Sequence, residues 1–261
     1  MTDAPTGGEE RAKLALIGFR YDENSSFMKG AADAPPQIRA ALRSEAWNMT
    51  SEDGVDLESI FFDAGDVEPP STGMFSLIES SIFTLLGDGM APISLGGDHS
   101  ITYPIIRAFA KKYPNLSILH FDAHPDIYDS FQGNRLSHAS PFARIMEERL
   151  VKRLVQVGIR PATAHQREQI KKFGVETIEM RDFKDGLEFN FDSPLYISFD
   201  VDGLDPAYAP GVSHREPGGL STRQVIDIIQ RLRGRVVGAD IVEVNPRMDP
   251  LDVTGTVWAK I

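Results

Sequence analysis

The stretch FDAHPDIYD, residues 121–129, places three side chains that can bind a metal ion at alternate positions behind an apolar run. These are Asp122, His124 and Asp126. Alternate residues of an extended chain point to the same side, so Asp122 and His124 face one way. Pro125 discourages continued strand pairing and lets Asp126 fold back toward them. Carboxylate and imidazole groups at this spacing predict a cation site.

Three other apolar runs end in side chains of the same kind. They supply His99 (ISLGGDHS, 93–100), Asp200 and Asp202 (ISFDVDGLDP, 197–206) and Glu243 (VGADIVEVNP, 237–246). Sites in open α/β sheets lie beyond the carboxyl ends of the strands, so these residues are expected at the same edge as residues 122–126.

The motifs at residues 122–126 and 200–202 would bring four aspartate carboxylates together with two histidines at this edge. A single acid after a strand is most often a helix N-cap or an Asx turn, and we assign Asp98, Asp205 and Asp240 to that structural class. Four carboxylates so close together could not all ionise without compensation. Two divalent cations would supply four positive charges against the four negative ones. The sequence therefore predicts a site for two metal ions.

Eight short aliphatic runs must position these residues. They are KLALIGF (13–19), SIFFDAG (59–65), MAPISLG (90–96), LSILHF (116–121), RLVQVGI (153–159), GVETIEM (174–180), PLYISF (194–199) and RVVGADIVEV (235–244). Such runs are typical of buried parallel strands, and amphipathic segments separate several of them. The clearest helix is STRQVIDIIQRLRG, where Ser221 and Gln224 form a capping-box pattern and Gly234 is expected to end the helix. The order predicts an α/β fold with a mostly parallel eight-stranded sheet, in a single domain over residues 1–261.

Composition narrows the function classes. The chain has 261 residues, a mass of 28.8 kDa and no cysteine, so a metal must be held by His, Asp or Glu. A net charge of −11 argues against nucleic acid as the main partner and is compatible with a cationic substrate. The first residues, MTDAPTGGEERAK, are polar, and no apolar run approaches the ~18 residues of a membrane span. We expect no membrane association and a cytoplasmic location.

The four motifs GGDHS, DAHPD, SFDVDGLDP and EVNP, in this order, resemble the ureohydrolases, the arginase and agmatinase family of binuclear manganese enzymes. The resemblance covers the chain from about the first strand to the last residues. DIYDSFQGNRLSHASPFARIME and APGVSHREPGGLS resemble plant-type arginases, some of which also accept agmatine. It implies a three-layer α/β/α fold and a homo-oligomer, a trimer or a hexamer.

The resemblance implies two metal sites. His99, Asp122, Asp126 and Asp200 would surround one ion, and Asp122, His124, Asp200 and Asp202 the other. The two shared aspartates would bridge the ions. Carboxylates with one imidazole per ion favour Mn²⁺, although Ni²⁺, Co²⁺ or Fe²⁺ could occupy the same ligands.

It also implies how a guanidino group is cleaved. Two ions activate a water as the nucleophile, and Asp126 hydrogen-bonds that water. Glu243 pairs with the guanidinium of the substrate. His138, in LSHAS, transfers the proton that the departing amine needs.

The motifs specify the residues around the guanidino group more closely than those that bind the far end of the substrate. The loop IYDSFQGNRLSH offers many hydrogen-bond donors, which suit the α-carboxylate of L-arginine, and we assign Asn134 to it. His214 is implied at the mouth of the pocket, whereas Arg215 stands where the resemblance implies isoleucine. We expect His120 to be a hydrogen-bonded core residue and His165 to be exposed. The preferred reaction is L-arginine to L-ornithine and urea, with agmatine or another guanidino acid as alternative substrates.

Two other classes remain open. A deacetylase of acetylpolyamines has a related architecture, but it needs one metal ion, a different ligand set and an electrophilic tyrosine. A catalytically silent, metal-stabilised regulatory subunit would not need all six ligands together with His138 and Glu243. Counting bound metal per chain separates the first class from a ureohydrolase, and urea release excludes the second.

Overall fold

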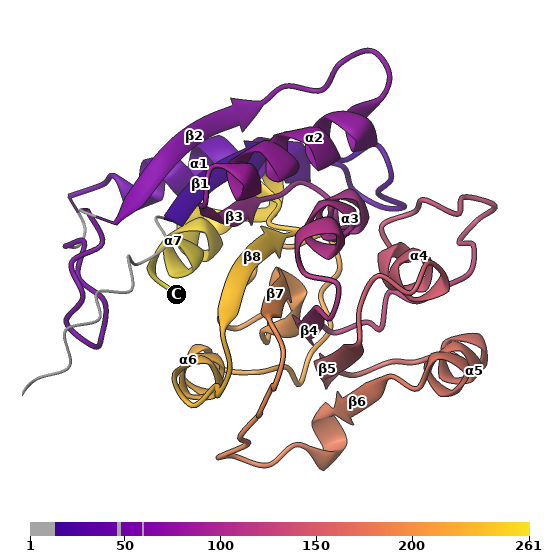
Figure 1. Cartoon of the computed structure of the whole chain (residues 1–261). Helices are drawn as coiled ribbons and strands as arrows, with labels where there is room; N and C mark the ends of the chain where they lie inside the picture. Colours follow the sequence, from indigo (N-terminus) through magenta and orange to yellow (C-terminus); the bar gives the residue numbers. More distant parts are fainter. Residues whose placement is uncertain (1–13, 46–47, 59) are drawn as a thin grey trace, which may run out of the picture.

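A single parallel sheet forms the centre of the computed structural model, which describes residues 14–45, 48–58 and 60–261 (Figure 1). The strand order is β2-β1-β3-β8-β7-β4-β5-β6, and each pair of neighbours is parallel. The strands are β1 (Leu14–Phe19), β2 (Phe61–Val67), β3 (Ala91–Leu95), β4 (Ser117–Phe121), β5 (Arg153–Ile159), β6 (Glu176–Glu179), β7 (Leu195–Asp200) and β8 (Val236–Val242).

The eight predicted strands and their parallel arrangement are confirmed. Boundaries differ by one or two residues at most ends. The first two predicted runs begin at residues 13 and 59, and these positions, like the N-terminal segment 1–13, lie outside the described residues. The extent of the domain, residues 1–261, stays a prediction.

Helices cover both faces of the sheet, which confirms the three-layer α/β/α arrangement (Figure 1). They are α1 (Ala34–Leu42), α2 (Met74–Gly87), α3 (Thr102–Lys112), α4 (Pro141–Glu147), α5 (Ala164–Phe173), α6 (Thr222–Gln230) and α7 (Val253–Lys260). One apolar cluster joins one face of the sheet to α2, α3, α4 and α5. A second cluster joins the other face to α1, α6 and α7. Strands buried on both faces explain why the apolar runs are nearly continuous.

Helix α6 begins as the sequence predicts and ends earlier. The Ser221 hydroxyl accepts from the backbone N–H of Gln224, and the Gln224 side chain accepts from the backbone N–H of Ser221. The helix stops at Gln230, so the expectation that Gly234 ends it is wrong. Gly234 instead has a φ of 152° and lies against the backbone of Phe191, where a Cβ atom would crowd the neighbouring chain.

The topology brings the four predicted motifs together. Strands β3, β8, β7 and β4 are consecutive in the centre of the sheet. His99, Glu243, Asp200 and Asp122 lie at or just beyond their respective carboxyl ends. Motifs separated by more than 140 residues of sequence therefore meet at one edge. Among the described residues, no helix is both long and apolar enough to cross a membrane.

Candidate metal centre

His99 lies at the centre of a buried group of carboxylates. It begins the short 3-10 helix η2 (His99–Ile101) directly after the Gly-Gly turn that follows β3. Its Nδ1 atom is 3.0 Å from Asp126 Oδ2 and 3.3 Å from both Asp122 Oδ2 and Asp200 Oδ2. One donor atom from each of these four residues lies within 4.8 Å of the others, so together they could hold a metal ion.

His124 lies at the centre of a second group. Its Nδ1 atom is 3.1 Å from Asp202 Oδ2 and 3.5 Å from Asp122 Oδ1. Asp122, His124 and Asp202 could hold a second ion, and Asp122 belongs to both groups. Asp200 lies beside this group, since its Oδ1 atom accepts from the backbone N–H of Asp202.

The electrostatics of the cluster favour bound cations. Burial, and then the charges of Asp202 and Asp122, raise the pKa of Asp200 well above its ordinary value. Burial alone would lower the pKa of His99, but the three carboxylates around it outweigh burial and raise this pKa well above its ordinary value. The resistance of Asp200 to ionisation and the retention of a proton by His99 are signs of uncompensated negative charge. The donor set therefore fits two divalent ions.

A buried hydroxyl and carboxylate orient His99 from behind. Its Nε2 atom is 3.2 Å from Ser198 Oγ, and this hydroxyl donates to Asp240 Oδ1 at 2.8 Å. The other oxygen of Asp240 accepts from Thr102 and Tyr196, both at 2.9 Å. Partners that fix a histidine ring keep its other nitrogen aimed at the metal. The prediction that Asp240 is a helix N-cap or an Asx turn is wrong, because it lies within β8 and accepts hydrogen bonds from buried side chains.

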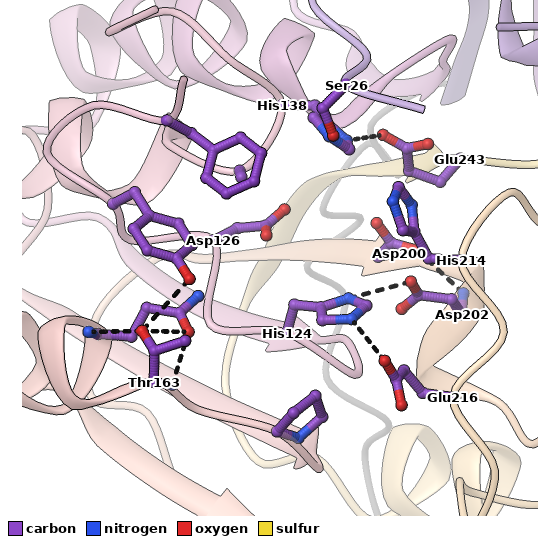
Figure 2. A pocket seen from close by; sticks show the side chains of 15 residues that line it. Ser26, His124, Asp126, His138, Thr163, Asp200, Asp202, His214, Glu216 and Glu243 are labelled. Carbon is purple, nitrogen blue, oxygen red and sulfur yellow. Dashed lines mark hydrogen bonds and ion pairs between the residues drawn. The ribbon is translucent and has the colours of Figure 1, made fainter. Parts of the chain in front are cut away.

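Glu243 and His138 form a buried pair beside the first group. His138 Nδ1 is 3.0 Å from Glu243 Oε1, which also accepts from the backbone N–H of His99 at 2.9 Å. Figure 2 shows this pair above His124, Asp200 and Asp202. Burial lowers the pKa of His138, but the Glu243 carboxylate outweighs it and raises this pKa to about 9. The pair can therefore bind a cation through its carboxylate and hold a proton on its imidazole.

Two of the side chains in this region sit on strained backbone. Asp126 has a φ of 44° and Glu243 a φ of 67°, both in the left-handed region that residues other than glycine avoid. Such strain persists only where the surrounding structure imposes it, and it is common at functional sites.

A cavity of about 210 Å³ opens onto both groups. Its lining includes the predicted residues His124, Asp126, His138, Asp200, Asp202, His214 and Glu243. The ring of His214 lies between two other imidazoles, with centroids 5.9 Å from His124 and 5.5 Å from His138. His99 and Asp122 are fully buried beneath the cavity floor.

Several predicted residues lie away from the cavity. Asn134 is not among the lining residues, and its amide donates to the side chain of Asn24 at 3.0 Å. The guanidinium of Arg215 donates to the backbone carbonyls of Pro210 and Met248, and Arg215 does not line the cavity. Of the loop donors between residues 127 and 138, only Tyr128 and His138 line the cavity.

The remaining histidines occupy structural positions. His120 is fully buried, and its Nε2 atom is 2.9 Å from Asp122 Oδ2, as expected of a hydrogen-bonded core residue. It also belongs to a possible metal-binding group with His99 and Asp122. His165 is partly exposed and lies 3.1 Å from Asp129.

Sequence reasoning missed several lining residues, among them Ser26 and Glu216. Ser26 Oγ is 2.8 Å from His138 Nε2, and Glu216 Oε1 is 3.6 Å from His124 Nε2 (Figure 2). Both lie in loops outside the four strand-end motifs. Glu216 was discoverable, because it is an acid two residues after His214 in a loop already assigned to the pocket mouth.

A model of the arginase family matches residues 12–261. The chain belongs to the arginase family. A rice protein named arginase 1, mitochondrial, is 47% identical, with 97% of this chain and 81% of the relative aligned. The solved structure of arginase from Medicago truncatula has a TM-score of 0.90 and 45% identity, covering 95% of this chain and 85% of that one. An agmatinase from Bacillus anthracis is 32% identical over 96% of this chain and 90% of its own length.

These comparisons confirm the predicted family, fold and enzyme class: this arginase-family protein is a hydrolase of the guanidino C–N bond. The arginase family depends on two metal ions, and the buried cluster could bind metal.

The prediction of a cytoplasmic location is wrong. Relatives from rice, Arabidopsis thaliana and Medicago truncatula are named as mitochondrial arginases. That prediction rested on the polar first residues and on the lack of a long apolar run, and neither feature distinguishes one cellular compartment from another.

Proposed function

We propose that this arginase-family protein hydrolyses L-arginine to L-ornithine and urea with two Mn²⁺ ions. The observation that carries the proposal is the convergence of the two metal-binding groups, which share Asp122, on one cavity with the Glu243 and His138 pair. The preference for arginine is supported by relatives named arginase at 44–47% identity, against agmatinases at 32%.

The proposed ligands divide into two sets that share the bridging aspartates 122 and 200. His99 and Asp126 complete the first set, and His124 and Asp202 complete the second. Oxygen donors with one imidazole per ion suit Mn²⁺ better than softer ions. When bound, the two ions would supply the activation of water as a nucleophile near neutral pH.

Glu243 is proposed to bind the guanidinium. Its Oε1 atom is engaged by His99 and His138, whereas among the described residues none donates to Oε2. That oxygen can accept from a guanidinium in the cavity, and the carboxylate charge strengthens the hydrogen bond. Asp126, held by its left-handed backbone, would orient the attacking water.

His138 is proposed to protonate the departing amine. Its Nδ1 edge faces the carboxylate that would hold the guanidinium, so a proton on Nδ1 lies on the substrate side of the ring. The raised pKa keeps the imidazole protonated at neutral pH in the absence of bound cations. A positioned acid of this kind contributes about 10²–10⁴-fold to a rate.

The decisive experiment is urea release from a panel of guanidino substrates with Mn²⁺ added. The panel should contain L-arginine, agmatine and a guanidino acid lacking the α-amino group. The proposal expects the highest kcat/KM for L-arginine. A higher value for another member would overturn arginine and retain guanidine hydrolysis. No urea from any member would overturn the function.

Agmatine is the second candidate substrate. Glu216 lines the cavity, whereas the sequence predicts hydrogen-bond donors for the far end of the substrate. Glu216 would attract the free amine of agmatine and repel the α-carboxylate of arginine.

A homo-oligomer, a trimer or a hexamer, is proposed from family resemblance and is tested by sedimentation of the metal-loaded protein.

A further inference from the structure

Both ring nitrogens of His138 have a side-chain partner, and one of the two partners is exposed whereas the other is buried. Nδ1 is 3.0 Å from Glu243 Oε1, and Nε2 is 2.8 Å from Ser26 Oγ. The histidine is 7% exposed and Glu243 is 4% exposed. Ser26, by contrast, is exposed and lines the cavity. The Ser26 hydroxyl therefore joins Nε2 of His138 to an exposed residue of the cavity wall, and Figure 2 shows the two side chains next to each other.

The segment that carries Ser26 is anchored on both sides of it. On one side, the backbone N–H of Asn24 donates to Asp98 at 2.9 Å, and its carbonyl accepts from the backbone N–H of His138 at 3.2 Å. On the other side, the carbonyl of Met28 accepts from the side chains of Asn245 and Ser213, both at 2.9 Å. Hydrogen bonds of the neighbouring backbone groups therefore fix the position of Ser26 relative to His138, and none of them involves the Ser26 hydroxyl.

The approach of this segment to the metal edge is built into the Gly-Gly turn. A Cβ atom on Gly97 would lie 1.8 Å from the carbonyl oxygen of Tyr21. The backbone N–H of Asp98 donates to the same carbonyl at 2.9 Å. Glycine at position 97 therefore lets residues 21–28 pack directly on the turn that carries His99.

We propose that Ser26 is a positioning residue that holds His138 by Nε2 and passes protons between this ring and solvent. This inference rests on the proposed function of His138 as the acid. A serine hydroxyl can donate and accept at the same time, which a relay needs. The alternative, a hydroxyl that merely satisfies a buried nitrogen, predicts no dependence on solvent proton donors.

The proton steps balance. Two bound divalent cations would disfavour a second proton on His138, so the relay starts from the neutral ring with its proton on Nδ1 and with Nε2 accepting from the Ser26 hydroxyl. As Nδ1 gives its proton to the departing nitrogen, Nε2 takes the Ser26 hydroxyl proton, and Ser26 takes one from hydronium or a protonated buffer base. The ring changes from one neutral tautomer to the other. The reverse transfer resets it when Nδ1 takes a proton of the water consumed in hydrolysis. Both hydrogens of that water end on the amine, so the protons entering and leaving through Ser26 cancel over a turnover.

The test compares Ser26→Ala, Ser26→Thr and the neighbouring control Ser25→Ala in Mn²⁺-loaded protein. Ser25 does not line the cavity. In weak buffer, Ser26→Ala should lose on the order of tenfold in kcat, less than loss of the acid itself, with little change in KM. Added imidazole should restore kcat in this variant, and Ser26→Thr, which keeps a hydroxyl, should resemble wild type. Unchanged kcat in Ser26→Ala, or a loss that no buffer restores, would overturn the relay.

A second measurement does not depend on turnover. In protein labelled with ¹⁵N-histidine, the Nε2 resonance of His138 is assigned by its absence in His138→Ala. Ser26→Ala should shift this resonance, and Ser25→Ala should leave it in place. An unmoved resonance would exclude the contact. If wild type released no urea while the resonance still shifted, the proposed function would fail and the positioning of His138 by Ser26 would stand.

Discussion

Nδ1 of His138 lies 3.0 Å from Oε1 of Glu243, although 105 residues separate them in sequence. Burial alone would raise the pKa of Glu243, but the histidine outweighs burial and lowers it. The same contact raises the pKa of His138 to about 9. Each group therefore holds the other in its charged form.

The first prediction concerns this pair in metal-free protein. Glu243→Gln should lower the pKa of His138 from about 9 to its ordinary 6.5 or below, because burial then acts with less opposition. An NMR titration of the ring protons measures this, with His138→Ala for assignment. A pKa that stayed near 9 would assign the shift to other carboxylates.

Stability should follow the same pair. The pKa of folded His138 is raised, so its contribution is complete below pH 6.5 and is lost as the pH rises through about 9. The pKa of Glu243 is lowered, so its contribution is complete above pH 4.5 and is lost as the pH falls through the folded value. The free energy of unfolding of wild type should exceed that of Glu243→Gln most between pH 4.5 and 6.5.

The second prediction separates the proton from the metals. His138→Ala should fold, retain two Mn²⁺ ions and lose about 10²-fold or more in kcat for arginine. Elemental analysis and urea release measure the two quantities on the same sample. Normal turnover across neutral and alkaline pH would make this histidine structural.

The sequence predicts the strands and the strand-end residues because both signals are local. Apolar runs bounded by glycine or polar turns identify β3, β4, β7 and β8, and the polar residues that follow each run identify the site. The strand order, β2-β1-β3-β8-β7-β4-β5-β6, depends on which distant strands pair, and no local pattern contains that information.

The sequence does not indicate which loop residues reach the cavity. Asn134 and Ser26 are both polar loop residues, and nothing in their spacing tells them apart. The structure turns Asn134 toward the side chain of Asn24 and brings Ser26 to His138. Contacts between loops far apart in sequence decide which hydroxyl or amide reaches the cavity.

The third prediction tests the bridging aspartates. Asp122→Ala and Asp200→Ala should each weaken binding of both ions, whereas Asp202→Ala should mainly affect one. Bound Mn²⁺ per chain after dialysis is the measurement. Because metal binds only the folded state strongly, chelation should also lower the Tm of wild type. Two tightly bound ions in both bridge variants would remove the bridging assignment.

The fourth prediction concerns protons released by metal. Carboxylate neighbours outweigh burial and raise the pKa of both His99 and His124 well above 6.5, so both imidazoles carry protons in metal-free protein at neutral pH. Binding must displace these protons, and affinity should fall as the pH falls. Calorimetry of Mn²⁺ binding in two buffers with different ionisation enthalpies counts the protons. His165→Gln, outside the cluster, should leave the count unchanged, and a count of zero in wild type would contradict the prediction.

The fifth prediction concerns the substrate tail. Glu216 lines the cavity, and its side chain is 37% exposed. Glu216→Gln should raise KM for agmatine by up to about fivefold, since a partly exposed ion pair is worth up to about 1 kcal/mol. KM for arginine should change less, because loss of attraction to the α-amino group is offset by loss of repulsion from the α-carboxylate. Glu188→Gln, an exposed acid outside the cavity, is the control.

Asn134→Ala completes this comparison, because the sequence and the geometry predict different results for it. If Asn134 binds the α-carboxylate, its loss should raise KM for arginine and leave agmatine unchanged. In the structure its amide bonds Asn24 and does not line the cavity, so neither KM should change by more than about twofold. A selective rise for arginine would mean that the loop of residues 127–138 moves onto the bound substrate. The preference for arginine over agmatine would then depend on this loop. Glu216 would interact only with the amino group at the far end of the substrate.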